Sequence, residues 1–456
     1  MAETQKQHES IISGSLWKSI WQLSWPMLII MVLNFIVGFT DIYVAGLINP
    51  QVQAAVGFIS QLYFLVIIVA NAVSVGTLAL ISRAVGADDL QRALHISRQS
   101  LLFSLACAVS LASVGFLMYR QIIALAGVPP AIRDIAGDFF RIFVLALGPN
   151  YVLIISNAVF NASGEVKKPL MTMSVVTVVN VITVFGLVFG LGPFPALGYK
   201  GIATATAISL IIGMLMNLLF LTFGRWKKLF AGPWKPSAET VRKIIRIGWP
   251  AAMLQITWNA GSIVLYNILG RLGDTSITAL ASISNGLRIE GIIYLPAFAL
   301  NMAASVLIGQ NLGAGSPERA EKAGWKIALS GAFFISAMAF VFFLNARHFA
   351  SLLAGNQNVL EETTRYLQFN MLSEPFMALS AILGGALQGA GDTRGTLKVI
   401  GICMWLIRLP LAWFFALVLQ YGASGVWMAM VISMCIQGIL MAARFHKGTW
   451  KHLKVE

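Results

Sequence analysis

The stretches SRAVGADDLQRA (residues 82–93) and GQNLGAGSPERA (309–320) decide how this chain is organised, because the same pattern follows a long apolar run twice. Two further pairs recur in the same order: NASGEVKKPL (161–170) with QGAGDTRGTL (388–397), and GIATATAIS (201–209) with GVWMAMVIS (425–433). The partners lie about 224 to 227 positions apart, which indicates an internal duplication. We expect an amino-terminal domain over 1–230 and a carboxyl-terminal domain over 231–456.

The composition indicates a membrane protein. Of the 456 residues 58% are hydrophobic and 11% are charged, whereas a soluble domain has about a quarter of its residues charged. Apolar runs long enough to cross a bilayer recur throughout, and about 20 residues suffice for that. We predict an all-α polytopic protein with twelve transmembrane helices, near 17–44, 55–82, 94–118, 138–160, 168–190, 199–223, 244–270, 278–308, 325–346, 365–388, 396–420 and 423–443.

Each domain then holds six helices. Because six is an even number, both copies enter the membrane from the same side, and the repeat is parallel. The expected product is two pseudo-symmetric six-helix lobes around a central cavity, an arrangement that suits transport by alternating access. A channel is disfavoured, because neither the duplication of the lobes nor the carboxylate of Asp41 inside the first apolar run requires an open pathway.

The net charge of +14 does not indicate a nucleic-acid partner, because the basic residues gather in alternate loops. This is the positive-inside pattern, and it predicts an inner-membrane protein with both termini cytoplasmic. The first residues, MAETQKQHESIISGS, lack the apolar core of a signal peptide. We expect a monomer. The loops concerned carry Arg83, Arg92 and Arg98; Lys167 and Lys168; Arg225, Lys227, Lys228 and Lys235; Arg319, Lys322 and Lys326; Arg394 and Lys398; and Arg444, Lys447, Lys451 and Lys454.

Nothing in the sequence indicates an enzyme, a metal site or a cofactor. The three cysteines each lie inside an apolar run, and no pair has metal-ligand spacing. The five histidines are scattered near loops and tails, and no phosphate-binding loop is present. These residues are Cys107, Cys403, Cys435, His8, His95, His348, His446 and His452.

The repeated segments together resemble one family. The chain resembles the MATE family of multidrug and toxic compound extrusion antiporters from about Trp17 to about Arg444. The segments that carry the resemblance are AAVGFISQLYFL, VGTLALISRAVGADD, RIEGIIYLPAFALNMAASVLIGQNLGAG, LSEPFMALSAILGGALQGAGDTRG and LIRLPLAWFF. The DinF-like branch looks nearest. The resemblance implies export of organic, often cationic or amphiphilic compounds, driven by inward flow of protons or sodium ions.

A flippase for a lipid-linked amphipathic molecule on the related two-lobed fold is the alternative. Such a protein needs a basic cavity for an anionic head group. The candidates for that cavity are Arg408, Arg288 and Arg141.

One carboxylate lies in the first apolar run, in NFIVGFTDIYVAG (34–46). Helical spacing places Asn34, Gly38 and Asp41 on one face, where Gly38 would admit another backbone and Asn34 would offer its amide. Desolvation penalises a charged carboxylate, so Asp41 can exchange a proton near neutral pH and so bias two conformations. Alternatively, Asp41 lies solvated at the outer end of the helix beside Tyr43, since about 23 residues at ~1.5 Å each nearly exhaust the bilayer.

The resemblance implies an asparagine and, four residues later, an aspartate in the fifth helix of the same site. This chain has Asn180 but carries Val184 at the aspartate's position. The remaining polar groups are Asp41, Asn180, Thr183 and Thr206. A sodium ion prefers several oxygen ligands, so we favour a proton as the coupling ion over sodium.

The carboxyl-terminal domain differs from the amino-terminal one. LQITWNAGSIVLYNILG (254–270) has no acid, and the repeat partner of Asp41 is Leu265. The candidates for substrate contacts there are Glu374, Glu290, Arg408, Trp258 and Asn259.

The roles of three of these candidates stay open. Glu290 either forms a structural ion pair, with Arg288 or another basic group, or takes part in function. Glu374 either lines the cavity and attracts a cation or has no such role. Arg408 is expected to be an internal partner of one of the carboxylates. Pro26, in the first helix, is a candidate hinge, because proline removes a backbone hydrogen bond and can kink a helix.

Overall fold

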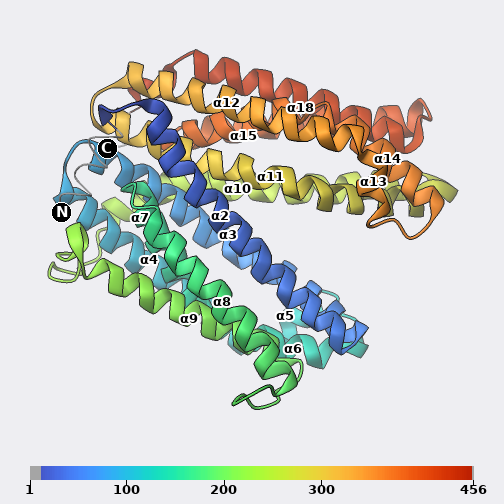
Figure 1. Ribbon diagram of the computed structural model, residues 1–456, viewed down its shortest axis with the longest axis horizontal. Helices are drawn as coiled ribbons and strands as arrows, with labels where there is room; N and C mark the ends of the chain where they lie inside the picture. Colours follow the sequence, from blue (N-terminus) through green and yellow to red (C-terminus); the bar gives the residue numbers. More distant parts are fainter. Residues whose placement is uncertain (1–11, 454–456) are drawn as a thin grey trace. The chain divides into compact units, whose positions relative to one another are not determined.

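The computed structural model describes residues 12–453, and this part of the chain consists of helices and loops without a strand (Figure 1). The termini whose cytoplasmic location the sequence predicts include residues 1–11 and 454–456, which lie outside the described residues. The helices of the first half are α2 (Leu16–Ile48), α3 (Pro50–Gly86), α4 (Leu90–Leu117), α5 (Tyr119–Leu125), η1 (Pro130–Ile132), α6 (Arg133–Leu145), α7 (Leu147–Ala162), α8 (Lys167–Phe189), α9 (Lys200–Leu221) and η2 (Gly224–Trp226).

The second half repeats this order, and the helix before α18 changes its geometry along its length. Its π-helical segments are η4 and η5, between α16 and the loop before α18. The helices are α10 (Ala238–Gly270), η3 (Gly273–Thr275), α11 (Ser276–Gly313), α12 (Pro317–Leu344), α13 (Ala346–Ser351), α14 (Gln357–Met371), α15 (Glu374–Gly389), α16 (Thr393–Ile402), η4 (Cys403–Arg408), α17 (Leu409–Trp413), η5 (Phe414–Val418), α18 (Gly422–His446) and η6 (Thr449–His452).

Each of the twelve predicted helices has a counterpart, but two of them are interrupted. The fourth is divided into α6 and α7, which are bent by 48°. The tenth is divided into α14 and α15. Pro149 and Pro375 lie just after the two breaks, at equivalent places in the repeat, and proline cannot donate the backbone hydrogen bond that would continue the helix.

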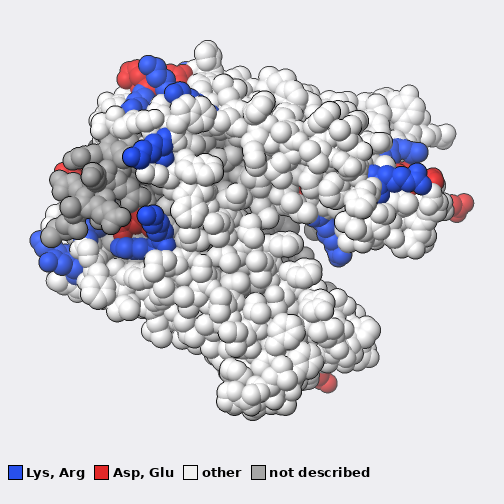
Figure 2. Space-filling model, viewed as in Figure 1, with Lys and Arg blue, Asp and Glu red and all other residues white. Residues whose placement is uncertain are grey.

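The helices have the length and surface of membrane spans. Within residues 12–453, nine helices are long and apolar enough to cross a membrane, or ten when the bent α6–α7 pair is one span. Large apolar side chains such as Leu117 and Phe333 are more than three-quarters exposed, which fits contact with lipid rather than water. On the face in Figure 2, charged side chains gather mainly near helix ends and leave a broad uncharged surface. The chain is a multi-pass membrane protein.

The chain divides into two compact units. In the described chain, unit 1 comprises Trp25–Gly248 with the short stretch up to Ser13, and unit 2 comprises Gly14–Ser24 and Trp249 onward. Two of the divisions fall inside helices, one residue before Pro26 in α2 and one residue before Pro250 in α10. The boundary expected at 230/231 lies instead in the connection before α10.

Close backbone contact ties the first part of α10 to unit 1. A Cβ on Gly76 of α3 would lie 2.5 Å from the Ile244 carbonyl oxygen, and one on Gly248 would lie 2.3 Å from that of Ala72. Glycine at both positions lets the two helix backbones approach, as is common between membrane helices. This contact accounts for the division at residue 248 rather than in the preceding loop.

The duplication is visible in local geometry. Gly164 and Gly391, in the paired motifs, have positive φ angles of 82° and 87°. A Cβ on Gly201 would lie 2.8 Å from the Leu187 carbonyl oxygen, and one on Gly425 would lie 2.9 Å from that of Phe415. These two glycine contacts show that the end of α8 corresponds to η5 and that the start of α9 corresponds to the start of α18.

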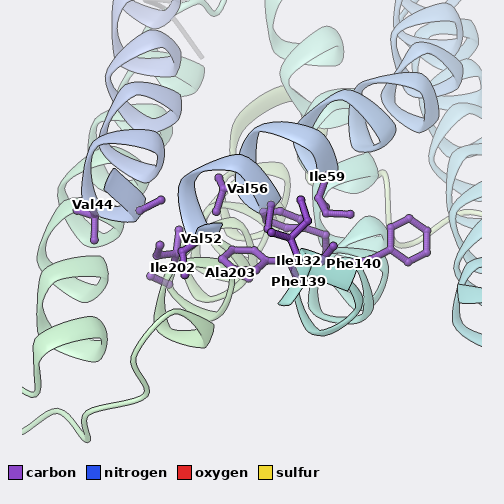
Figure 3. Packing of buried hydrophobic residues seen from close by; sticks show 14 of the residues in the cluster. Val44, Val52, Val56, Ile59, Ile132, Phe139, Phe140, Ile202 and Ala203 are labelled. Carbon is purple, nitrogen blue, oxygen red and sulfur yellow. The ribbon is translucent and has the colours of Figure 1, made fainter. Parts of the chain in front are cut away.

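A core of apolar side chains fills the end of unit 1 at which α2 meets α3. It includes Val44 of α2, Val52 and Val56 of α3, Phe139 of α6 and Ile202 of α9, all buried (Figure 3). This cluster closes over the carboxyl-terminal end of α2, the part of the helix that carries Asp41.

Candidate functional site

The polar centre of unit 1 is a chain of three side chains from α2, α8 and α9. Asp41 is 9% exposed, and its Oδ2 accepts a hydrogen bond of 2.8 Å from the Thr206 hydroxyl. The Asn180 amide donates to the same hydroxyl oxygen over 3.2 Å. Two buried oxygens of this centre, Asp41 Oδ1 and Asn180 Oδ1, have no hydrogen-bond partner among residues 12–453. The centre therefore has spare acceptors next to an acid.

The structure brings Asp41, Asn180 and Thr206 together, whereas Asn34 lies apart from them. Asn34 is exposed, and its amide donates to the Ile30 carbonyl on its own helix over 2.8 Å. A Cβ on Gly38 would meet open space, so no other backbone approaches there. Residues 34 and 41 share a helix face but lie about 10 Å apart along the axis, which is too far for their side chains to pair.

Thr183 and Val184 border the same region of α8 without adding a polar group to it. Thr183 is buried and donates to the Val179 carbonyl over 2.7 Å, so its hydroxyl is satisfied within its own helix. Val184, where the family resemblance leads one to expect an aspartate, is 0% exposed and belongs to the same apolar core as Val44 and Ile202. The site thus has a single carboxylate, with apolar packing in place of the second.

Unit 2 has a different buried polar centre, formed by Glu290 of α11, Glu374 of α15 and Arg408 at the end of η4. Their side chains are 1%, 2% and 4% exposed. The Tyr294 hydroxyl lies 3.3 Å from Glu290 Oε2 and donates to it. Arg408 Nε donates to the Ser433 hydroxyl over 2.8 Å.

Arg408 is not an ion-pair partner of either carboxylate, contrary to our expectation. In the described chain neither carboxylate oxygen lies within 4.0 Å of its nitrogens, although Arg408 and Glu290 interact electrostatically at longer range. Its guanidinium carbon lies 5.0 Å from the ring centre of Trp258. Glu290 does not pair with Arg288 either, because Arg288 is exposed.

The remaining candidates occupy less enclosed positions. Asn259 is exposed on α10, and its amide donates to the Gln255 carbonyl over 2.9 Å. Trp258 is partly buried beneath Arg408. Pro26 is buried within the continuous helix α2.

Sequence reasoning did not find Tyr294, Tyr366 and Ser433. One local signal was available, since Tyr294 follows Glu290 by four residues and so lies on the same helix face. Tyr366 of α14 and Ser433 of α18 come from other elements and could not be paired with Glu290 or Arg408 from sequence alone.

Comparison with known proteins decides the family. The MatE family model matches residues 26–185 and again 250–414, once in each copy of the repeat. The chain belongs to the MATE family. Members of this family are transporters, so the chain is a transporter and not an enzyme.

The relatives cover nearly the whole chain at low identity. A probable multidrug resistance protein NorM of Thermotoga maritima is 23% identical over 438 residues, covering 95% of this chain and 93% of NorM. The MATE transporter VcmN of Vibrio cholerae, solved in a bent form, has a TM-score of 0.87 at 20% identity, with 97% and 98% of the two chains covered. A MATE structure in the straight conformation has a TM-score of 0.85 at 21% identity, with 96% and 98% covered. The fold is that of the MATE transporters.

Proposed function

We propose that this MATE protein is a multidrug efflux antiporter. It exports organic, cationic or amphiphilic compounds in exchange for protons, by alternating access. The relatives named for multidrug resistance support the efflux role. The observation that carries the coupling role is the buried carboxyl group of Asp41, held by Thr206 with an unpaired oxygen beside it.

The donors and acceptors around Asp41 favour a proton over sodium. When Asp41 is ionised, Thr206 donates to one of its oxygens. When Asp41 is protonated, its hydroxyl needs an acceptor, and Asn180 Oδ1 is a buried acceptor without a partner in residues 12–453. Hard cations take about six or more oxygen ligands, and the loss of a carboxylate at Val184 leaves too few side-chain oxygens for that.

Proton binding at Asp41 would be coupled to bending of α2 at Pro26. The division between units falls one residue before Pro26, so the part of α2 that carries Asp41 belongs to unit 1 and the entry of the helix to unit 2. A bend at Pro26 would change the Asp41 centre relative to that entry. Bent and straight forms both occur among MATE structures of this fold.

The proposal includes location and substrate contacts. We place the protein in the inner membrane with both termini cytoplasmic, since the basic residues gather in alternate loops. Trp258 and Asn259, on one turn of α10, are our candidates for substrate contact, because their side chains are not fully buried.

The test is uptake of a fluorescent organic cation into inverted membrane vesicles under imposed proton and sodium gradients, each applied separately. We expect proton-driven uptake by the wild type and a loss of at least tenfold in Asp41→Asn. Asn34→Ala is the matched control, because Asn34 lies on the same helix but is exposed, and it should retain uptake. Sodium-driven uptake that persists without a pH gradient would contradict proton coupling.

If no cation moved under either gradient, the test would favour the alternative, a flippase for an anionic lipid-linked molecule. The three arginines considered for a basic cavity have separate environments. Arg141 lies over the rings of Phe116 and Tyr119, Arg408 lies over Trp258, and Arg288 is exposed. This dispersal argues for the antiporter.

A further inference from the structure

The interior of unit 2 encloses two carboxyl groups and one guanidinium group. Glu290, Glu374 and Arg408 are each at least 96% buried, and Glu290 interacts electrostatically with each of the other two. If both acids were ionised, the group would carry a net charge of −1 with little access to water. An uncompensated buried charge is costly, and such a group takes up a proton instead.

The hydrogen bonds point to the acid that holds the proton. Glu290 accepts from Tyr294 and interacts electrostatically with Arg408, so it is the acid that the surroundings stabilise as an anion. The buried Oε2 of Glu374, by contrast, has no hydrogen-bond partner among residues 12–453. The closest charged influence on Glu374 is Glu290 itself, which is repulsive when both are ionised.

We infer that unit 2 contains a second proton-binding centre, in which Glu374 binds and releases a proton beside the buried Glu290, with Arg408 at longer range from Glu290. The inference rests on the proposed proton-coupled function only for its role in transport, because proton binding at Glu374 can be measured without transport. A protonated Glu374 is a donor, and Glu290 Oε1 is a buried acceptor that lacks a partner in the described chain.

The internal duplication supports a separate centre rather than a copy of the first. The repeat partner of Asp41 is Leu265, which is 3% exposed and apolar. Unit 2 therefore has an apolar residue at the position of Asp41, and its acids come from α11 and α15 instead.

Other groups facing the centre would not substitute for Glu374. From α11 and α14 come the hydroxyls of Tyr294 and Tyr366, and from α18 comes that of Ser433, which is occupied by Arg408. The thiol of Cys403 on η4 also faces Arg408. Of the groups facing this centre, Glu290 and Glu374 are the carboxyls, so a protonated carboxyl here is one of these two.

The test measures protonated carboxyl groups directly. Full-length protein in lipid nanodiscs is titrated with pH while the infrared carbonyl stretch of protonated carboxyls is followed. Asp41→Asn should keep one band near neutral pH that disappears at alkaline pH, and the double variant Asp41→Asn/Glu374→Gln should lose it. A band of equal size in the double variant, or no band in Asp41→Asn, would overturn the inference.

Two further variants keep the result interpretable. Glu165→Gln is the matched control, since Glu165 is also buried but pairs with Lys168 and Arg225, so this change should remove no band. If Glu374→Gln does not fold, Tyr294→Phe in the Asp41→Asn background removes a donor to Glu290 and should shift the band's frequency and midpoint pH. An unchanged band in that variant would count against the centre. Failure of the antiporter proposal would appear separately, as absent transport in a protein that still shows the band.

Discussion

At the residue scale, the coupling centre of unit 1 shows what a helical pattern can and cannot predict. Helical spacing grouped Asp41 with Asn34 and Gly38 on one face, but Asp41 is buried whereas the other two are exposed. Its partners lie on α8 and α9, and the resemblance rather than the pattern indicated them. The predicted contact of Asn34 with Asp41 is wrong, because two residues on one helix face can still lie far apart along the helix axis. The Asn34 amide donates instead to the Ile30 carbonyl, one turn earlier.

Thr206 should prove essential through its hydroxyl rather than its bulk. Thr206→Val keeps the shape but removes the donor to Asp41 and the acceptor of Asn180, so we expect proton-driven uptake to fall about tenfold or more, as for loss of a buried hydrogen bond worth about 1–3 kcal/mol. Thr206→Ser retains the hydroxyl and should keep most of the activity. The measurement is initial uptake rate against pH in inverted vesicles. Equal rates in the two variants would exclude this role.

At the element scale, the helices were predictable but their interruptions and lengths were not. Long apolar runs located all twelve segments, because a span must be apolar along its whole length. The breaks before Pro149 and Pro375 depend on whether neighbouring groups satisfy the freed carbonyls, which a single sequence does not reveal. The π-helical stretch ending at Arg408 was likewise unpredicted, and it determines which way that side chain points.

The contact between α3 and α10 should depend on Gly76. Gly76→Ala would place a methyl group 2.5 Å from the Ile244 carbonyl oxygen, and we expect it to lower stability by about 1–3 kcal/mol through overpacking. Gly57→Ala is the matched control on the same helix, because a Cβ there meets nothing within 4 Å. Thermal unfolding in detergent, followed by size-exclusion chromatography, would compare the two. A smaller shift for Gly76→Ala than for Gly57→Ala would contradict this packing.

Arg98 of α4 binds the connection between the two copies of the repeat. Arg98 donates to the Leu229 and Lys228 carbonyls over 2.6 and 2.7 Å, and its guanidinium fills the space beside Gly232. Arg98→Ala would free both carbonyls, so we expect chymotrypsin to cleave after Phe230 several-fold faster. Lys227→Ala, at an exposed site, is the control and should leave the rate unchanged. An unaltered rate in Arg98→Ala would show that other contacts hold this segment.

At the scale of the whole molecule, the sequence predicted the duplication from its repeated motifs and the helical segments from their apolar length. The positions of the unit divisions could not be read in this way. They depend on which unit each end of α2 and α10 packs with, and glycine-mediated contacts such as that of Gly248 with Ala72 decide it. The loop before α10 marks where the first copy of the repeat ends in the sequence. It does not mark where the helices stop packing against unit 1.

The predicted orientation can be tested on the two copies together. In a background with the native cysteines replaced by alanine, Leu197→Cys before α9 and Lys227→Cys after it should react with a membrane-impermeant maleimide from opposite sides, because α9 crosses the membrane once. Intact cells should label Leu197→Cys, and inverted vesicles should label Lys227→Cys. The repeat makes a second, independent pair, Tyr421→Cys and Lys447→Cys around α18, which should behave in the same way. The parallel repeat requires agreement between the pairs, since six helices separate equivalent points. Labelling of Lys227→Cys and Lys447→Cys from opposite sides would refute the parallel arrangement, whereas labelling of both from outside would keep the repeat and reverse the orientation that the basic loops predict.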